Sequence, residues 1–324
     1  MIATLRGALL GNLYTLAPHL RRVLLPLSDL QTETLGVTLE DEAMGEVRVS
    51  ALLSRARETA RGCVVLVHGL GGDATSGYLL QMAHAARDAG LDCVRLSMRG
   101  ADKSGEDLYH AGLTDDLRAM LASPELAHYE TLYLVGFSLG GHIALKYATE
   151  AHDARLASVC AIGSPIDLEA AASAIDQRLR YPYRRHVLAA LFDAHDAVVR
   201  RGRARLSSAE ARKARSIVDY DERIVAPRFG YESARAYYRG ESVAPRLRSL
   251  EVPSLYIGAD HDPMVPARVV KPALDRASAA LSVRFFDRAG HIGFSSTAKL
   301  DEGRETHLFA QVLDWLTHAP KAAR

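Results

Sequence analysis

One stretch decides the fold of this 324-residue chain: Leu132-Tyr133-Leu134-Val135-Gly136-Phe137-Ser138-Leu139-Gly140-Gly141. Apolar residues lead into a Gly-x-Ser-x-Gly turn and helix-forming residues 142–148 follow, so the stretch predicts a strand, a sharp turn and a helix. A serine at the tip of such a turn has a strained backbone and needs small neighbours, which Gly136 and Gly140 supply. Free N–H groups at the start of the helix would stabilise an oxyanion beside Ser138, which is therefore the candidate nucleophile.

Apolar runs and amphipathic segments alternate on both sides of this stretch. Residues 63–67 are continuously apolar, as expected of a strand that is covered on both faces. Residues 35–39 and 47–52 alternate apolar and polar around a turn, which predicts a hairpin at the sheet edge. Further strands are expected at residues 92–97, 157–163, 254–258 and 283–286, and helices at 76–89, 113–121 and 307–318. This order indicates the α/β class, with a mainly parallel central sheet and helices on both faces.

The composition is that of an ordinary globular protein. The chain is 48% hydrophobic and 24% charged, and its net charge of +1 gives no overall attraction to nucleic acid. We expect a single domain over residues 1–324. Cys63, Cys93 and Cys160 lie in apolar runs without the spacing of a zinc site, which predicts free buried thiols in a reducing compartment.

The first thirty residues are apolar but repeatedly interrupted by charged side chains. No uncharged run there approaches the roughly 18–20 residues that a membrane span requires. The segment predicts one or two short helices, broken at Pro18 and Pro26. We therefore expect no transmembrane segment and a cytoplasmic location.

Residues 167–239 contain no continuous apolar strand and predict a helical insertion between two strands, placed as a lid or cap over the candidate site. From Arg178 to Arg215, eleven Arg or Lys residues stand against three acids, an excess of eight positive charges. A solvated surface would explain this excess, and so would attraction of an anionic substrate or a lipid surface.

A histidine and a carboxylate follow Ser138 in the chain. His291 lies after the last expected strand, in a loop with Gly290 and Gly293. A serine hydroxyl is too weak an acid to attack an ester unaided, so an imidazole must accept its proton and a carboxylate must orient that imidazole. Asp262, before Pro263, is the favoured carboxylate, and Asp260 is the alternative.

Together these motifs resemble the YheT-type α/β-hydrolase family of bacterial carboxylesterases, which is similar to eukaryotic α/β-hydrolase-domain lipases. The resemblance rests on residues 68–72 (His-Gly-Leu-Gly-Gly), Arg99-Gly100, residues 109–112 (Tyr-His-Ala-Gly), residues 136–141, Asp262-Pro263 and residues 290–294 (Gly-His-Ile-Gly-Phe). It implies an α/β-hydrolase fold and ester hydrolysis through Ser138, Asp262 and His291, without metal or cofactor. The backbone N–H groups of Leu70 and Leu139 would form the oxyanion hole. His68 precedes the serine, the wrong order for the catalytic base of this fold, and is expected to be structural.

The expected function is hydrolysis of a small-molecule carboxylic ester, lipid-like or anionic, through an acyl-enzyme intermediate. An acyltransferase or a thioesterase on the same scaffold is an alternative, because a fold does not fix a function. A ligand-binding protein without turnover is the non-enzymatic alternative. Burst release from p-nitrophenyl esters separates it from an acylating serine.

Overall fold

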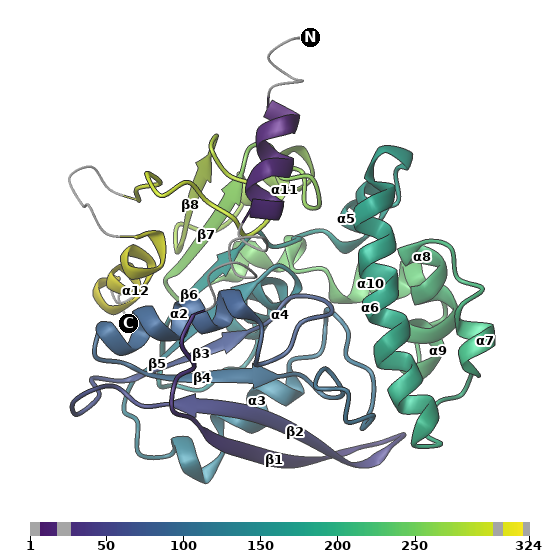
Figure 1. Cartoon of the computed structure of the whole chain (residues 1–324), viewed down its shortest axis with the longest axis horizontal. Coiled ribbons are helices and arrows are strands. Elements are labelled where there is room, and N and C mark those ends of the chain that lie inside the picture. The colour runs from purple at the N-terminus through teal and green to yellow at the C-terminus, as the bar shows by residue number, and fades with distance from the viewer. Residues whose placement is uncertain (1–6, 18–26, 301–306, 320–324) are drawn as a thin grey trace.

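The computed structural model describes residues 7–17, 27–300 and 307–319. Its centre is an eight-stranded sheet in the order β1-β2-β4-β3-β5-β6-β7-β8 (Figure 1). Strand β2 pairs antiparallel with β1 and β4, and the pairs from β4 to β8 are parallel. The strands are β1 (Glu33–Asp41), β2 (Gly45–Ser54), β3 (Cys63–Val67), β4 (Asp92–Ser97), β5 (Leu132–Phe137), β6 (Leu156–Ile162), β7 (Ser254–Ala259) and β8 (Leu281–Phe286). The mainly parallel sheet and the edge hairpin expected from the sequence are both confirmed.

The sheet has a hydrophobic core on each face. Every residue of β3 and β5 is buried, as the continuously apolar runs predict. Leu79 of α2 and Phe309 of α12 pack on one face, whereas Leu117 of α3 and Ile143 of α4 pack on the other. The helices that cover the sheet are α2 (Gly77–Asp88), α3 (Asp115–Leu121), α4 (Leu139–Ala148), α11 (Ala267–Leu274) and α12 (Leu308–His318). The three cysteines are free and buried, as predicted.

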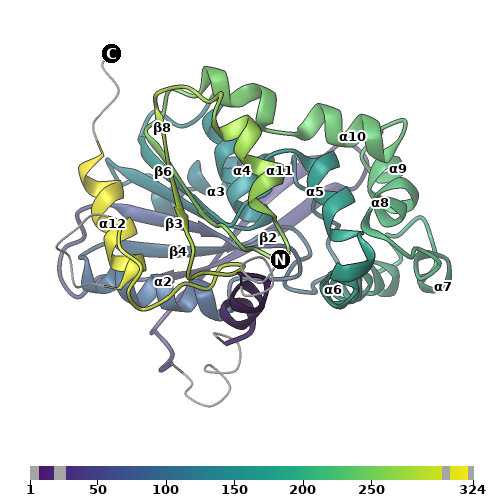
Figure 2. The same ribbon diagram turned by 90° about the horizontal axis from the view of Figure 1, so that it is seen from above.

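Between β6 and β7 the chain forms helices that gather beside one end of the sheet (Figures 1 and 2). These are α5 (Leu168–Ile175), α6 (Tyr181–Arg200), α7 (Ser208–Ala211), α8 (Ile217–Tyr220), α9 (Ala226–Arg228) and α10 (Ala234–Glu241). A π-helical turn, Asp221–Val225, joins α8 to α9. We call residues 168–241 the cap. The cap has its own apolar core, which also includes Leu108 and Ala111 from the loop before α3. The insertion expected at residues 167–239 falls on this segment, and its role as a lid stays a prediction.

Residues 7–17 form a helix, and the predicted breaks at Pro18 and Pro26 lie outside the described residues. The backbone of this helix packs closely on the loop after β7, because a Cβ added to Gly11 would lie 1.9 Å from the carbonyl oxygen of His261. Within the described ranges, no helix is long and apolar enough to cross a membrane.

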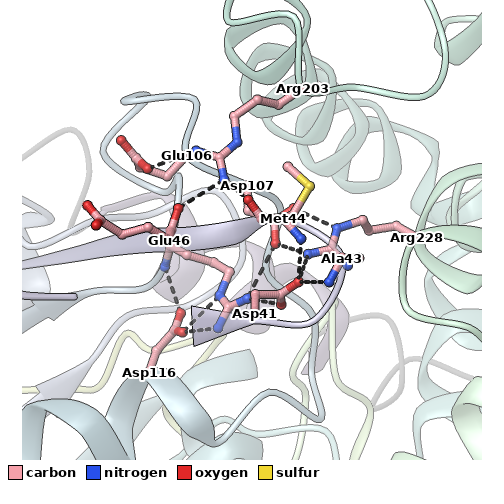
Figure 3. A network of polar contacts seen from close by, with 10 residues as sticks. Asp41, Ala43, Met44, Glu46, Glu106, Asp107, Asp116, Arg203 and Arg228 are labelled. Atoms are coloured by element: carbon pink, nitrogen blue, oxygen red, sulfur yellow. Dashed lines mark hydrogen bonds and ion pairs between the residues drawn. The ribbon is translucent and has the colours of Figure 1, made fainter. Parts of the chain in front are cut away.

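A buried network of charges joins the cap to the sheet (Figure 3). The Arg99 side chain, two residues after the end of β4, is 1% exposed. Its guanidinium lies 2.7 Å from both the Asp41 and the Asp116 carboxylates and 3.3 Å from that of Asp107. Arg228 of the cap binds two of the same carboxylates, those of Asp41 and Asp107. We call this set the Arg99–Arg228 network. Charges buried at this depth are tolerated only when they are paired, so the network fixes the cap against the end of β1 and the loop before α3.

A second arginine of the cap holds the same hairpin. Arg203 donates to the backbone carbonyls of Met44 and Glu46 and lies 3.3 Å from the Glu106 carboxylate (Figure 3). The turn of the β1–β2 hairpin is therefore attached to the cap at two arginines.

Candidate active site

Ser138 lies at the tip of the turn between β5 and α4 in a strained conformation. Its backbone angles are φ 50° and ψ −121°, outside the regions that a residue with a Cβ normally occupies. The flanking glycines are required by close approach: a Cβ on Gly136 would lie 2.2 Å from the Gly140 carbonyl oxygen, and one on Gly140 would lie 2.3 Å from that of Val67. The turn therefore holds the Ser138 side chain at the carboxyl end of the sheet, where sites of parallel sheets form.

The structure brings Ser138, His291 and Asp262 into one hydrogen-bonded chain. The Ser138 hydroxyl donates to His291 Nε2 over 3.0 Å, and His291 Nδ1 donates to Asp262 Oδ2 over 2.9 Å. The other oxygen of Asp262 accepts two backbone hydrogen bonds of 2.8 Å, from Met264 and Val265. Asp262 is 4% exposed, and both of its carboxylate oxygens accept hydrogen bonds. Because the carboxylate is held in this way, it fixes the His291 imidazole in the tautomer that can accept the serine proton.

Asp260, the alternative carboxylate, lies elsewhere. Its Oδ1 pairs with Lys271 Nζ at 2.9 Å, and its side chain is 35% exposed. The structure therefore places Asp262, and not Asp260, beside His291.

The loop that carries His291 is held by the helix of residues 7–17. The His291 N–H donates to Thr15 Oγ1 over 2.8 Å. A Cβ on Gly290 would lie 2.2 Å from the Gly11 carbonyl oxygen, so the loop and the helix are in backbone contact. Sequence reasoning missed this support, although Gly7 and Gly11 lie one helical turn apart, a spacing that can allow close packing.

Two backbone N–H groups near Ser138 are available to an oxyanion. Leu70 and Leu139 line the same cavity as Ser138. Leu139 is the first residue of α4, so its N–H has no partner within the helix. The N–H groups of Gly69 and Gly71 donate to tyrosine hydroxyls, whereas no partner is found in the described residues for the N–H of Leu70 between them. The arrangement is suited to hold a developing negative charge on an acyl oxygen.

Two further histidines have bonding partners away from Ser138. His68 Nδ1 lies 2.7 Å from the Gly69 carbonyl, and its Nε2 accepts from the Met98 N–H over 3.1 Å. His142, in α4, lies between the carbonyls of Pro165 and Glu241. Burial lowers the pKa of both rings, and each ring contacts backbone groups of neighbouring loops rather than Ser138.

A cavity of about 120 Å³ extends from Ser138 into the cap. Its walls are largely aliphatic and aromatic side chains from both the sheet side and the cap, including Tyr109, Leu139, Ile175, Leu191, Tyr237 and Met264. An apolar portion of a ligand would therefore be bound here, with its reacting group at Ser138.

One carboxyl group interrupts the apolar wall of this cavity. Asp221, at the start of the π-helical turn, is 9% exposed and accepts a 2.5 Å hydrogen bond from the Tyr238 hydroxyl. Burial raises the pKa of the Asp221 carboxyl to about 7, and no cation of the described residues pairs with it. Sequence reasoning did not select Asp221, because nothing local distinguishes a buried carboxyl from a helix-capping one. π-helical turns are frequent at functional sites, but that turn is visible only in the structure.

This buried acid predicts a pH dependence of stability. The folded pKa of about 7 lies above the reference value of 3.8, so the native state keeps a proton that the unfolded state has lost. Stability should therefore fall as the pH rises between these values, by up to about 1.4 kcal/mol for each pH unit. Asp221→Asn keeps a partner for Tyr238 and should remove this contribution. Urea unfolding at pH 5 and pH 8 measures this contribution. The free energy of unfolding of the variant minus that of wild type should be larger at pH 8 than at pH 5. The same difference at both pH values would contradict the expectation.

The described residues contain no group of three or more His, Cys, Asp or Glu side chains that could hold a metal ion.

Residues 62–297 match the family model described as the alpha/beta hydrolase fold. The chain is 30% identical over 264 residues to the Escherichia coli protein YheT, which carries the name of an esterase, and covers 76% of that protein. It is 26% identical to the human phospholipase ABHD3 over 73% of this chain, but spans only 59% of that relative.

Solved structures share the architecture at lower identity. The 2,6-dihydroxy-pseudo-oxynicotine hydrolase has a TM-score of 0.58 and 16% identity, with 96% of this chain and 75% of that chain covered. The Pyrococcus furiosus esterase Pf2001 has a TM-score of 0.52 and 15% identity, with 81% and 85% covered. At these identities the likeness concerns the fold.

Proposed function

Because this chain belongs to the alpha/beta hydrolase family, we propose that it is a serine hydrolase that cleaves carboxylic esters through Ser138, His291 and Asp262. The observation that supports this most is the continuous hydrogen-bonded chain from the Ser138 hydroxyl to the Asp262 carboxylate. Membership of the fold family alone would not support this function, because proteins with the same fold catalyse other reactions.

The proposed reaction has two steps. Ser138 Oγ attacks the ester carbonyl carbon while His291 Nε2 takes the serine proton, and the N–H groups of Leu70 and Leu139 bind the oxyanion. His291 then gives that proton to the leaving alcohol, which departs and leaves the acyl group on Ser138. Water, deprotonated by His291, hydrolyses this acyl-enzyme and restores the serine.

The substrate that fits the cavity is an ester with an apolar acyl or alcohol portion. The cavity is lined mainly by apolar side chains, and Ser138 lies in its wall. Curated relatives are named esterase, phospholipase and, in Saccharomyces cerevisiae at 24% identity, monoacylglycerol lipase. We infer a lipid-like ester for this chain.

The test is covalent labelling combined with turnover. A fluorophosphonate probe should add once per folded chain, on the peptide that contains Ser138, and p-nitrophenyl butanoate should give p-nitrophenol with a burst if deacylation is the slower step. Unfolded chain is the control and should not label. Folded chain that neither labels nor turns over the ester would favour the ligand-binding alternative. Labelling by the probe, together with transfer of the butanoyl group of p-nitrophenyl butanoate to an added alcohol in preference to water, would favour an acyltransferase.

A further inference from the structure

Large hydrophobic side chains are exposed at two neighbouring places on the surface. The helix of residues 7–17 exposes Leu9 (67%), Leu13 (58%) and Leu16 (53%), whose spacing places them on one face. Leu179 (95%), in the turn between α5 and α6, and Tyr181 (52%), the first residue of α6, are also exposed. Among the described residues only Leu27 and Val218 are also large, hydrophobic and exposed, so this exposure is concentrated. Single exposed leucines need no explanation, but a cluster of them does.

The helix and the turn lie side by side. The hydroxyl of Tyr183, in the first turn of α6, donates to the side-chain oxygen of Asn12 in the helix. Figures 1 and 2 show the helix of residues 7–17 next to the start of α6. We call Leu9, Leu13, Leu16, Leu179 and Tyr181 the apolar ridge.

Arginines without acidic partners surround the turn of the apolar ridge. The guanidiniums of Arg180 and Arg268 both bind the Gln177 side-chain oxygen, and Arg184 binds the Asp176 backbone carbonyl. Arg178 and Arg185 are exposed in the same segment. In the part of the chain that the structure describes, none of these five guanidiniums forms an ion pair with a carboxylate.

The basic run noted in the sequence contains both paired and unpaired cations. Arg201, Arg203 and Arg212, further along the cap, are paired with Glu106 or Asp196. Arg201 and Arg203 fasten the cap to the loop before α3. Among the described residues, Arg178, Arg180, Arg184 and Arg185 near Leu179 form no ion pair with a carboxylate, and neither do Arg200, Arg205, Lys213 and Arg215.

The apolar ridge borders the catalytic loops. Arg180 Nε donates to the Pro263 carbonyl over 2.7 Å, next to Asp262, and Thr15 of the helix accepts from the His291 N–H. A surface that binds through this ridge would therefore lie beside the loops that hold the acid and the base.

We propose that the apolar ridge and its five arginines dock this protein on an anionic lipid bilayer. Apolar side chains that enter the headgroup region and cations that meet anionic headgroups act together in interfacial binding. A second copy of this chain is the less suitable occupant, because a two-fold contact through this surface would bring its unmatched arginines face to face. The positive charge of the surface therefore favours an anionic partner, and its exposed leucines favour a partner with an apolar interior. An anionic lipid bilayer has both properties.

Vesicle flotation of the full chain carrying Ser138→Ala tests the proposal apart from any catalysis. We expect this chain to bind vesicles of phosphatidylcholine with phosphatidylglycerol, to bind phosphatidylcholine alone at least about tenfold more weakly, and to dissociate as salt rises from about 0.1 M to about 1 M. Leu179→Ser with Tyr181→Ser, and separately Leu9→Ser with Leu13→Ser, should each lower binding to the anionic vesicles. Leu27→Ser, which removes an exposed leucine outside the ridge, should not.

The charges are tested with a matched pair of variants. Arg178→Gln with Arg185→Gln should weaken binding to anionic vesicles at least about tenfold. Lys213→Gln with Arg215→Gln removes the same charge from exposed positions beyond the other end of the 20-residue helix α6 and should leave binding nearly unchanged. Equal losses in the two pairs, or equal binding to both kinds of vesicle, would overturn the proposal. A dimer that the Leu179 and Tyr181 changes dissociate, without vesicle binding, would overturn it in favour of a second copy.

Discussion

Ser138→Ala is expected to abolish ester turnover and leave the fold intact. Loss of a serine nucleophile removes the atom that forms the acyl-enzyme, and triad members act as a unit, so kcat should fall by at least about 10³-fold. The backbone strain at Ser138 (φ 50°) is shared by any residue with a Cβ at this position, so alanine should add little new strain. Steady-state hydrolysis of p-nitrophenyl butanoate measures the loss, and the urea midpoint measures the fold.

His291→Ala is the companion variant. It should cost a similar factor, and the double variant should be little worse than either single one, because neither residue works without the other. A folded Ser138→Ala protein that keeps more than about a tenth of the wild-type kcat would remove Ser138 from the mechanism, since a lost nucleophile costs far more than that.

Asp262→Asn is expected to lower kcat by about 10⁴-fold, whereas Asp260→Asn should change it only a few-fold. An amide at position 262 can donate to His291 Nδ1, which then carries no proton, so Nε2 becomes protonated and cannot accept from Ser138. Asp260 pairs with Lys271 at a partly exposed position, where such pairs contribute little.

These two variants carry the same chemical change, aspartate to asparagine, at two different positions, so each serves as the control for the other. Both are measured with the same ester, and their urea midpoints show whether a loss of activity reflects unfolding. The reverse result, a large loss for Asp260→Asn and a small one for Asp262→Asn, would mean that the hydrogen bond to His291 does not identify the working carboxylate.

The elements of the sheet could be predicted because their signals are local. Residues 63–67 are apolar without interruption, and such a run is expected only of a strand that is covered on both faces. The signal for the turn at Ser138 was equally local. Its glycines are required by close backbone contacts within the turn and with the neighbouring strand β3. Asp262 and Asp260 could only be ranked. They are two positions apart in the same loop, and the sequence alone does not show which of the two side chains faces His291.

What escaped prediction depends on contacts between distant segments. Thr15 and His291 are 276 positions apart, and no pattern near either residue indicates that one holds the other. The short helices of the cap, such as α7 and α8 with four residues each, are too brief for a periodic signal. Asp221 lines the cavity at the start of a π-helical turn, which no local pattern in the sequence indicates.

The Arg99–Arg228 network also affects the order in which a newly synthesised chain can fold. Asp41 leaves the ribosome early, and Arg228 follows 187 residues later. Until then, Asp41, Asp107 and Asp116 share the single guanidinium of Arg99, and burial of three carboxylates around one cation is unfavourable. The edge of the sheet near Asp41 should therefore stay hydrated during translation, exposing the β1–β2 hairpin to chaperones and proteases until the cap has been made.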